Sequence, residues 1–341
     1  MHSKPATFVI YCVAVAAFIA AVTSHASAAT LTVGPGQTYT TLAAAIAATH
    51  DGDTVNVLAG TYVNDFAEIH SKITLNAVGG RVKLQATAFI PNQKAILITD
   101  TDTTINGFTF IGARVTQASG GNGAGIRYQG GNLTLNKCYF ASNQNGILAA
   151  PDPAGTITIT ASEFYRNGAA SGPTAGYTHN IYIGEIAKLD IENSYVHGAN
   201  VGHEIKSRAL VTIINNSRVV DGPTGTASYS IDLPNGGAAT LTNNQIEQGP
   251  ASQNPIIVTF GEEGGVYANS ALTMTGNLIE NDLNSGSVVG VRNATTVTAQ
   301  IGSTRLYGIP PGVFTSGPAS VSGTQTLATE PAISTRHPWL K

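Results

Sequence analysis

The sequence predicts an all-β protein, a right-handed parallel β-helix, because short strands recur in blocks and helical patterns are absent between them. Residues 132–140, 156–164 and 188–196 each carry apolar side chains at the second, fourth and ninth positions. Apolar alternation over four residues is typical of a strand. Each block is therefore interpreted as two short strands joined by a tight turn, repeated in every coil of a solenoid.

A second series of strands opens each coil, and it contains Ile126, Ile147, Ile181, Ile205, Ile231 and Ile257. Their successive spacings are 21, 34, 24, 26 and 26 residues, which indicates a coil of about 21–26 residues with one insertion of roughly a dozen. These side chains are expected to stack inside the solenoid. The turn within the block contains Asn193, Asn216 or Asn243, and Asn tolerates left-handed backbone angles. We expect its amide to bond with the copies above and below.

The first 28 residues have the three parts of an export signal. Lys4 supplies the positive start, residues 8–22 are apolar, and residues 26–28 form a small-residue cleavage site. A membrane anchor is the alternative, but the apolar run is shorter than the ~20 residues that span a bilayer. The mature protein is therefore predicted to be secreted or periplasmic, without membrane contact. It retains one cysteine, Cys138, which excludes an internal disulfide and is expected to be buried.

Both ends of a solenoid expose strand edges and core, so each end needs a cover. Residues 29–52 are predicted to form the N-terminal cap, with a helix over Thr41–His50. The β-helix itself is predicted over residues 53–307. Residues 308–341 are rich in Pro, Gly, Ser and Thr, so they are expected to form a tail that lies along the solenoid or is partly disordered.

Charged residues are scarce along the whole chain. They make up 11% of it, the net charge is −3, and no run of Lys or Arg occurs. Proteins that bind nucleic acid usually carry a basic patch or stripe. A nucleic-acid partner is therefore not expected.

The order of helix, Gly52-Asp53, strand and Gly60-Thr61-Tyr62 resembles the entry to pectin-lyase-like parallel β-helices, and the resemblance extends over about residues 30–307. That superfamily contains polysaccharide lyases, hydrolases, epimerases and non-catalytic adhesins. The resemblance implies an extracellular protein that handles an acidic or neutral polysaccharide. No single family's catalytic motif is matched: the one tryptophan, Trp339, lies in the tail, and Gly202-His203-Glu204 resembles only the last of three polygalacturonase motifs.

Two outward columns flank the stacked isoleucines, because side chains alternate along a strand. The column after each isoleucine contains Arg127, Leu148, Tyr182, Lys206, Asp232 and Val258. The column before it contains Gly125, Gly146, Asn180, Glu204, Ser230 and Ile256. Neighbouring coils are about 4.8 Å apart, so Tyr182, Lys206 and Asp232 are expected to form a line with Glu204 and Asn180 beside it. The opposite interpretation is a solvated face on which these charges only pair with one another.

This face carries the groups that β-elimination from a uronic acid needs: a base for the C5 proton, a cation for the carboxylate and a donor for the leaving oxygen. Lys206 or His203 is the candidate base, Arg208 the carboxylate partner and Tyr182 the donor. A lysine acts as a base only when burial or a neighbouring cation lowers its pKa. The candidate substrate-binding residues are His179, Asn180, Glu204, Asp232, Arg127 and Tyr177, the last on the Gly-rich insertion 168–179. C5 epimerisation shares the first step and stays open.

Two other functions stay open at the level of sequence. An inverting glycoside hydrolase needs two carboxylates ~6.5–9.5 Å apart, for which Glu204 and Asp232 are the candidates. A glycan-binding or cell-surface β-helix without catalysis has the same scaffold. Ca²⁺ is the one cofactor considered, held by Glu204 and Asp232 or by Glu262 and Glu263, whose loop is otherwise an ordinary acidic turn. The chain is expected to be a monomer.

Overall fold

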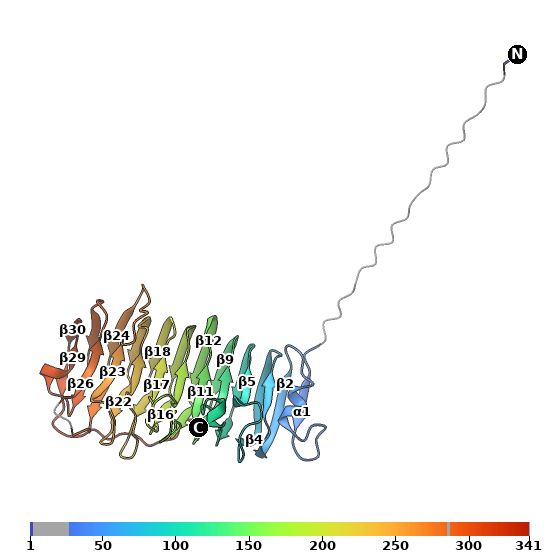
Figure 1. Ribbon diagram of the computed structural model, residues 1–341, viewed down its shortest axis with the longest axis horizontal. Coiled ribbons are helices and arrows are strands. Elements are labelled where there is room, and N and C mark those ends of the chain that lie inside the picture. Colours follow the sequence, from blue (N-terminus) through green and yellow to red (C-terminus); the bar gives the residue numbers. More distant parts are fainter. Residues whose placement is uncertain (3–26, 285–286, 341) are drawn as a thin grey trace.

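The chain forms a solenoid in which coils of parallel strands succeed one another along a single axis (Figure 1). The computed structural model describes residues 1–2, 27–284 and 287–340. Strand pairings are parallel at the first coil, in the middle and at the last coil. The predicted parallel β-helix is confirmed. Most of the expected export signal falls in residues 3–26, which lie outside the described residues.

Successive coils place their strands in three stacks. The first stack contains β1 (Thr30–Val33), β2 (Thr54–Val63), β4 (Ile73–Gln85), β6 (Thr103–Asn106), β9 (Asn132–Asn136), β12 (Asp152–Thr160), β15 (Ile186–Glu192), β18 (Val211–Asn215), β21 (Ala238–Thr242), β24 (Ala271–Thr275), β27 (Ala299–Gly302) and β30 (Ala319–Ser322). The second stack begins with the far ends of β2 and β4 and continues through β7 (Phe108–Ile111), β10 (Tyr139–Ala141), β13 (Glu163–Tyr165), β16 (Tyr195–His197), β19 (Arg218–Val220), β22 (Gln245–Gln248), β25 (Leu278–Asn281), β28 (Arg305–Tyr307) and β31 (Gln325–Thr326). The third stack contains β3 (Ala67–Ile69), β5 (Ala95–Thr99), β8 (Ala124–Tyr128), β11 (Asn145–Ala149), β14 (Ile181–Ile183), β17 (Ile205–Ser207), β20 (Ile231–Leu233), β23 (Ile256–Phe260), β26 (Val289–Asn293) and β29 (Thr315–Ser316).

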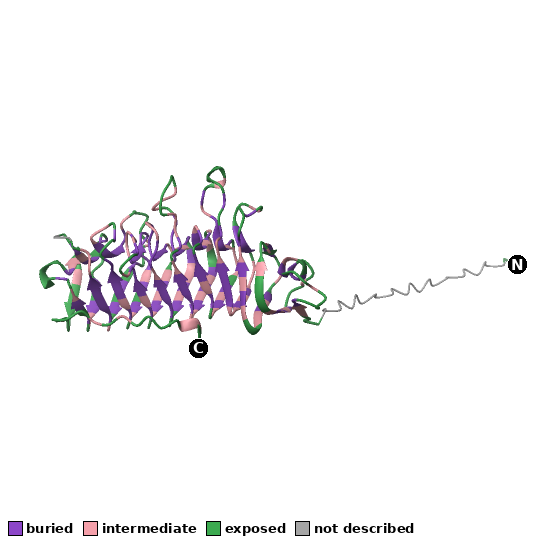
Figure 2. Cartoon of the chain, turned by 90° about the horizontal axis from the view of Figure 1, so that it is seen from below, coloured by how far each residue is buried: buried purple, intermediate pink, exposed green. Residues whose placement is uncertain are grey.

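The core runs the length of the solenoid between these stacks, and Figure 2 shows the buried faces of successive strands in register. The six isoleucines of the third stack are all fully buried, as predicted. Burying such a side chain stabilises a fold by roughly 1.5–3 kcal/mol. The rings of Phe110, Phe140 and Phe164 form a second internal column, with centroids 4.7 Å and 4.6 Å apart.

The predicted register is wrong at one coil of the third stack. Ile231 pairs with Val258, so Val258 and not Ile257 continues the isoleucine column. Ile256, Ile257 and Val258 are three consecutive apolar residues, and all three are buried. Alternation carries no information within such a run, so the sequence could not set the register there.

The turn within each block has the predicted backbone but a different bonding pattern. Asn193, Asn216 and Asn243 have φ angles of 50°, 47° and 54°, the left-handed region that Asn tolerates. The bonds between coils are made by the residue that follows the turn and not by these amides. The Ser217 N–H donates to Asn244 Oδ1 at 2.9 Å, and the Asn244 N–H donates to Asn277 Oδ1 at 2.9 Å.

Both ends of the solenoid differ from the predicted boundaries. The expected helix over residues 41–50 is the five-residue α1 (Leu42–Ile46), which Thr41 caps by accepting from the Ala44 N–H at 3.3 Å. Its role as a cap stays a prediction. The predicted end at residue 307 is too early, because β30 and β31 pair with β27 and β28 and add a further coil. No helix among the described residues is long and apolar enough to cross a membrane.

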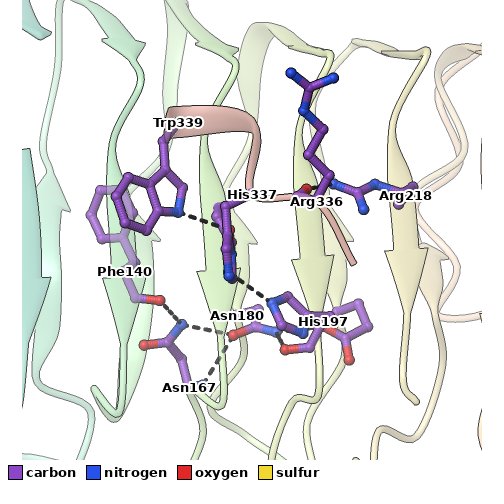
Figure 3. A network of polar contacts seen from close by, with 10 residues as sticks. Phe140, Asn167, Asn180, His197, Arg218, Arg336, His337 and Trp339 are labelled. Carbon is purple, nitrogen blue, oxygen red and sulfur yellow. Dashed lines mark hydrogen bonds and ion pairs between the residues drawn. The ribbon is translucent and has the colours of Figure 1, made fainter. Parts of the chain in front are cut away.

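Three short 3-10 helices complete the secondary structure: η1 (Gln117–Ser119), η2 (Pro311–Val313) and η3 (Pro338–Leu340). The chain end that carries η3 returns to the middle coils (Figure 1). There His337 Nδ1 and Trp339 Nε1 each bond to a carboxylate oxygen of Glu163 at 2.8 Å, and Figure 3 shows both rings lying against the second stack. The Arg81 guanidinium lies 3.9 Å from the centre of the Trp339 ring. Cys138 is buried, as expected, and burial raises the pKa of its thiol to about 11.

Candidate functional site

The predicted outward column on the third stack is confirmed through four pairings. Arg127 pairs with Leu148, Leu148 with Tyr182, Tyr182 with Lys206, and Lys206 with Asp232. The next member is Thr259 and not Val258, because of the register shift at β23. Strand pairing therefore places the Tyr182 hydroxyl, the Lys206 amine and the Asp232 carboxylate on successive coils.

A cavity of about 510 Å³ opens over the middle of this column. Its lining contains Asn122, Leu148, Gly176, Tyr177, His179, Tyr182, His203, Lys206, Arg208 and Glu263. The insertion that precedes β14 contributes Tyr177, whose side chain is 79% exposed. The structure thus brings six of the sequence-predicted site residues to one cavity, and it adds Glu263. We call this cavity the column pocket.

Lys206 lies between two carboxylates on the floor of the column pocket. Its Nζ is 2.8 Å from Asp232 Oδ2, and it also donates to Glu263 Oε1. Asp232 is 2% exposed and accepts a second bond from the Thr259 hydroxyl at 2.7 Å. Burial favours the neutral amine, but the two carboxylates outweigh it and raise the pKa of Lys206. The side chain is therefore a cation at neutral pH.

Arg208 is the second cation of the pocket, two residues further along the chain. One guanidinium nitrogen pairs with Glu263 Oε2, Nε donates to the Tyr182 hydroxyl oxygen at 3.2 Å, and another nitrogen donates to Asn235 Oδ1 at 2.6 Å. Hydrogen bonds from a charged guanidinium are stronger than those between neutral groups. Arg208 thus couples the tyrosine hydroxyl to the carboxylate of Glu263.

Glu263 is the site residue that sequence reasoning did not place here. Its loop follows β23, and the carboxylate reaches back over two coils to bridge Lys206 and Arg208. Burial alone raises the pKa of Glu263, but the bonds from these two cations outweigh it and the pKa is lowered. The neighbouring Glu262 pairs with Arg292 Nε at 2.6 Å. Both carboxylates therefore have cationic partners, which does not favour the calcium role considered for this loop.

The two pocket histidines stack with Tyr182 and Tyr229, with ring centroids 4.8–5.5 Å apart. His179 Nδ1 accepts from the His203 N–H at 2.9 Å, and His203 Nδ1 accepts from the Tyr229 N–H at 3.3 Å. Burial lowers the pKa of His203 to about 4, although Asp232 opposes this, and burial lowers the pKa of His179 well below its ordinary value. Both rings are therefore neutral at neutral pH and carry their proton on Nε2.

This tautomer bears on the role expected of His203. Nδ1 is occupied by the backbone N–H, and Nε2 lies 3.4 Å from Asp232 Oδ2. A neutral ring in this arrangement has no free lone pair, so it acts as a hydrogen-bond donor. The geometry therefore favours an orienting role for His203, toward Asp232 or the substrate, and does not favour His203 as the base.

The expectation that Glu204 and Asn180 face the groove is wrong. Both are fully buried, within a ladder in which the Asn167 amide donates to Asn180 Oδ1 at 2.7 Å and the Asn180 amide donates to Glu204. The other Glu204 oxygen accepts from the Ala199 N–H at 2.8 Å. Burial, followed by the charge of Asp221, raises the pKa of Glu204 well above its ordinary value. With Glu204 in the interior, neither the hydrolase pair nor a calcium site of Glu204 and Asp232 fits this geometry.

Arg127 also lies outside the column pocket. It belongs to the predicted column, but Leu148 separates it from Tyr182, and it is not among the lining residues. Burial lowers the pKa of its guanidinium, and the charge of Tyr182 opposes this shift. Arg127 lies two coils from Tyr182, toward the N-terminal end of the solenoid.

No protein-family model and no curated protein matches this sequence. Solved structures with the same fold include an alginate lyase from Paenibacillus sp. str. FPU-7, at TM-score 0.61 and 17% identity over 87% of this chain and 99% of that one. They also include pectate lyase Pel9A, at TM-score 0.55 and 14% identity over 91% of this chain and 82% of that one. PfbA, a surface adhesin of Streptococcus pneumoniae, has TM-score 0.50 and 12% identity over 80% of this chain and 83% of that one.

These similarities establish the fold and leave the activity to the site itself. At 12–17% identity they carry no assignment of residues from one protein to another. They include two polysaccharide lyases and one adhesin. The predicted resemblance to pectin-lyase-like parallel β-helices is confirmed as a likeness of fold.

Proposed function

We propose that the column pocket binds an acidic polysaccharide and cleaves it by β-elimination next to a uronic acid. One observation carries this proposal: a carboxylate, Glu263, bridges two cations beside a tyrosine hydroxyl inside an open pocket. A uronate carboxylate has the charge and the two-oxygen geometry to take the same place. We also propose that the protein acts outside the cytoplasm as a monomer, in keeping with the N-terminal signal pattern.

Substrate binding in this proposal exchanges one carboxylate for another. Arg208 and Lys206 would hold the uronate carboxylate after Glu263 moves away with its loop. Glu263 is 45% exposed at its side chain, so its release disturbs no buried packing. Tyr177, which is exposed at the rim, offers a flat ring to a sugar, whereas His179 and His203 are stacked between other rings and line the pocket with their edges. The line of the column fits an extended polymer.

The chemical step passes the C5 proton to a base, breaks the C4–O bond and delivers a second proton, from an acid, to the leaving oxygen. Neutralising the carboxylate makes the C5 proton more acidic, because negative charge develops on the carboxylate as that proton leaves. The electron pair forms the C4–C5 double bond, the C4–O bond breaks, and the departing oxygen takes a proton. No water is added, so the product carries an unsaturated sugar at its new end.

We assign the base to Tyr182 and the acid to Lys206, which reverses the roles expected from sequence. Lys206 as a base needs a lowered pKa, and its two carboxylate partners raise it. A protonated amine suits the donation of a proton to the leaving oxygen. Tyr182 lines the pocket one coil from Lys206, and its oxygen accepts from Arg208 Nε at 3.2 Å, which fixes its position for taking the proton. C5 epimerisation shares the first step and differs in where the proton returns.

The test is a panel of polyuronates and neutral polysaccharides incubated with the purified chain. Ultraviolet absorbance of the unsaturated product and the release of reducing ends are followed together. Cleavage by elimination raises both signals, hydrolysis raises reducing ends alone, and epimerisation raises neither but changes the sugar composition. Lys188→Ala, which removes a half-buried lysine of β15 that pairs with Asp190, is the matched control for Lys206→Ala. Absence of the unsaturated product from every polyuronate contradicts the proposal.

A further inference from the structure

Three carboxylates meet where the C-terminal tail passes the second stack, away from the column pocket. Glu280 lies on β25, Asp282 follows that strand, and Glu330 lies on the tail. One oxygen from each lies within 4.8 Å of the others. Glu280 is buried, Asp282 is half-buried and Glu330 is exposed. None of the three lines the pocket.

Glu280 is the reason to regard this cluster as a ligand site. Glu280 is 0% exposed, and neither of its carboxylate oxygens has a hydrogen-bond partner within the described part of the chain. A buried carboxylate without partners costs several kcal/mol, so such groups are paired, protonated or bound to metal. The lack of partners at Glu280 therefore calls for a positively charged ligand or a proton.

A second buried glutamate of the same stack shows how this chain satisfies such a group when it uses protein donors. Glu163 is 1% exposed, and its two oxygens receive bonds from His197, His337 and Trp339. Glu280 has two more carboxylates nearby instead of donors. Burial, then Asp282 and Glu330, raise the pKa of Glu280 to about 7. The two sites have similar burial and opposite surroundings.

We infer that Glu280, Asp282 and Glu330 bind a divalent cation of the oxygen-preferring class, and that Ca²⁺ is the best match. Ca²⁺ takes six to eight oxygen ligands in flexible geometry, whereas Mg²⁺ requires a near-ideal octahedron of about 2.0–2.1 Å bonds. Glu330 is an exposed ligand on the tail and Glu280 is a fixed ligand on a strand, and this combination suits Ca²⁺, which has the less demanding geometry. Backbone carbonyls and water would supply the remaining ligands. This inference does not depend on the proposed function.

The cation would fasten the tail to the solenoid at a second point. The first point is Glu163, to which His337 and Trp339 bond (Figure 3). Six residues separate Glu330 from His337, so the two attachments act on one short segment. Removing the cation would free residue 330 and weaken the docking of Trp339. Trp339 is the only tryptophan of the chain, which makes its fluorescence a specific reporter of that docking.

The binding experiment uses the full chain, stripped of metal with a chelator and dialysed. Isothermal titration with CaCl₂ is expected to show saturable binding, with MgCl₂ at least tenfold weaker. Glu330→Gln changes an exposed side chain and cannot disturb the core, and it should weaken Ca²⁺ binding at least tenfold. Glu192→Gln, an exposed carboxylate of β15, is the matched control and should bind like the parent. Glu280→Gln should abolish binding.

Two results would overturn the inference. One is the absence of saturable Ca²⁺ binding to the parent protein. The other is binding that Glu330→Gln and Glu280→Gln both leave unchanged, which would locate the ion elsewhere. The fluorescence arm adds a structural readout: Ca²⁺ should change the Trp339 emission of the parent and of Glu192→Gln, with the half-saturation found by calorimetry. It should leave the emission of Glu330→Gln unchanged at that concentration.

Discussion

Residues two positions apart in the chain have different surroundings and, we propose, different functions. Tyr182 on β14 and Lys206 on β17 line the column pocket, whereas Asn180 and Glu204, which immediately precede these strands, are sealed in a ladder of buried hydrogen bonds. Simple alternation gives both pairs the same direction. Asn180 and Glu204 lie next to the turn that follows the second stack. There the Ala199 N–H donates to Glu204 and the Asn180 amide donates to the His197 carbonyl, and this turn excludes solvent.

The alternation of side chains along a strand therefore decides only whether a side chain points into the isoleucine core. Whether an outward side chain reaches solvent depends on what the adjoining loop covers. Charge has different consequences at the two places. Lys206 keeps its charge because carboxylates compensate it, whereas burial and a neighbouring carboxylate favour the neutral form of Glu204. We call Tyr182 and Lys206 the functional column and Asn180 and Glu204 the structural column, and we expect the two to respond differently to substitution.

The largest effect is expected at the pocket column. Tyr182→Phe and Lys206→Ala should each lower kcat on a polyuronate by ~10²–10⁴-fold, the usual contribution of a general acid or base. Tyr182→Phe should keep the melting temperature within a few degrees of the parent. Lys206→Ala leaves the buried Asp232 carboxylate without its cation and should lower the melting temperature, so kcat is compared per folded molecule. Thermal melts and initial rates, measured beside Lys188→Ala, check both parts. A variant that loses activity only in proportion to lost folded protein would place these residues with the structural column.

The structural column should show the opposite behaviour. Glu204→Ala leaves the Ala199 N–H and the Asn180 amide without their acceptor, which costs about 1–3 kcal/mol of unfolding free energy. Glu204→Gln keeps a neutral acceptor and should cost much less. Both variants should retain the kcat of the parent per folded molecule. Denaturant titration measures the unfolding free energy. A large loss of kcat in Glu204→Gln would mean that Glu204 takes part in catalysis.

The same column predicts a pH dependence of stability. The pKa of Glu204 is raised in the folded state, and that of Asp221 is raised by burial to about 6 from its ordinary value of 3.8. Groups of this kind bind protons more tightly in the folded protein, so their stabilisation is complete at low pH and is lost as the pH rises through the folded pKa. The melting temperature should fall from about pH 4 to above pH 6. Glu204→Gln should flatten this slope, and an unchanged slope would contradict the buried, protonated assignment.

The smallest effect is expected at the loop carboxylate. Glu263→Gln weakens the bridge to Lys206 and Arg208, and partly exposed ion pairs contribute about 0–1 kcal/mol. Because Glu263 competes with the substrate carboxylate in our proposal, KM should fall by up to about fivefold while kcat changes little. Steady-state kinetics at low salt measure this. A rise in KM would mean that Glu263 assists binding.

The fold was largely predictable because it depends on periodicity. The isoleucine column and the strand blocks have short-range patterns that survive without tertiary information. Prediction ended where the pattern did, at the apolar run Ile256 to Val258 and in the tail, where β30 and β31 are mostly exposed and carry few apolar residues. The helix at residue 41 was recognised by its alanines but is half as long as expected.

The site was predictable only in part, for a related reason. Tyr182, Lys206 and Asp232 follow from the register of adjacent strands, and His179 and His203 follow from their positions at strand entrances. Glu263 is 57 residues from Lys206 and reaches it through a loop, whose path no local pattern fixes. The burial of Glu204 depends on the turn that covers it, which sequence alternation does not describe.

The most direct test of the central claim is the fate of water during cleavage. Polyuronate is digested in water enriched in heavy oxygen, and the fragments are analysed by mass spectrometry. Elimination predicts fragments with an unsaturated end and no heavy oxygen at the cleaved bond, formed by the parent and by Lys188→Ala but not by Tyr182→Phe. Fragments that carry one heavy oxygen per cleavage would identify a hydrolase. No fragments from any polyuronate would show that the column pocket does not perform the lyase chemistry assigned to it.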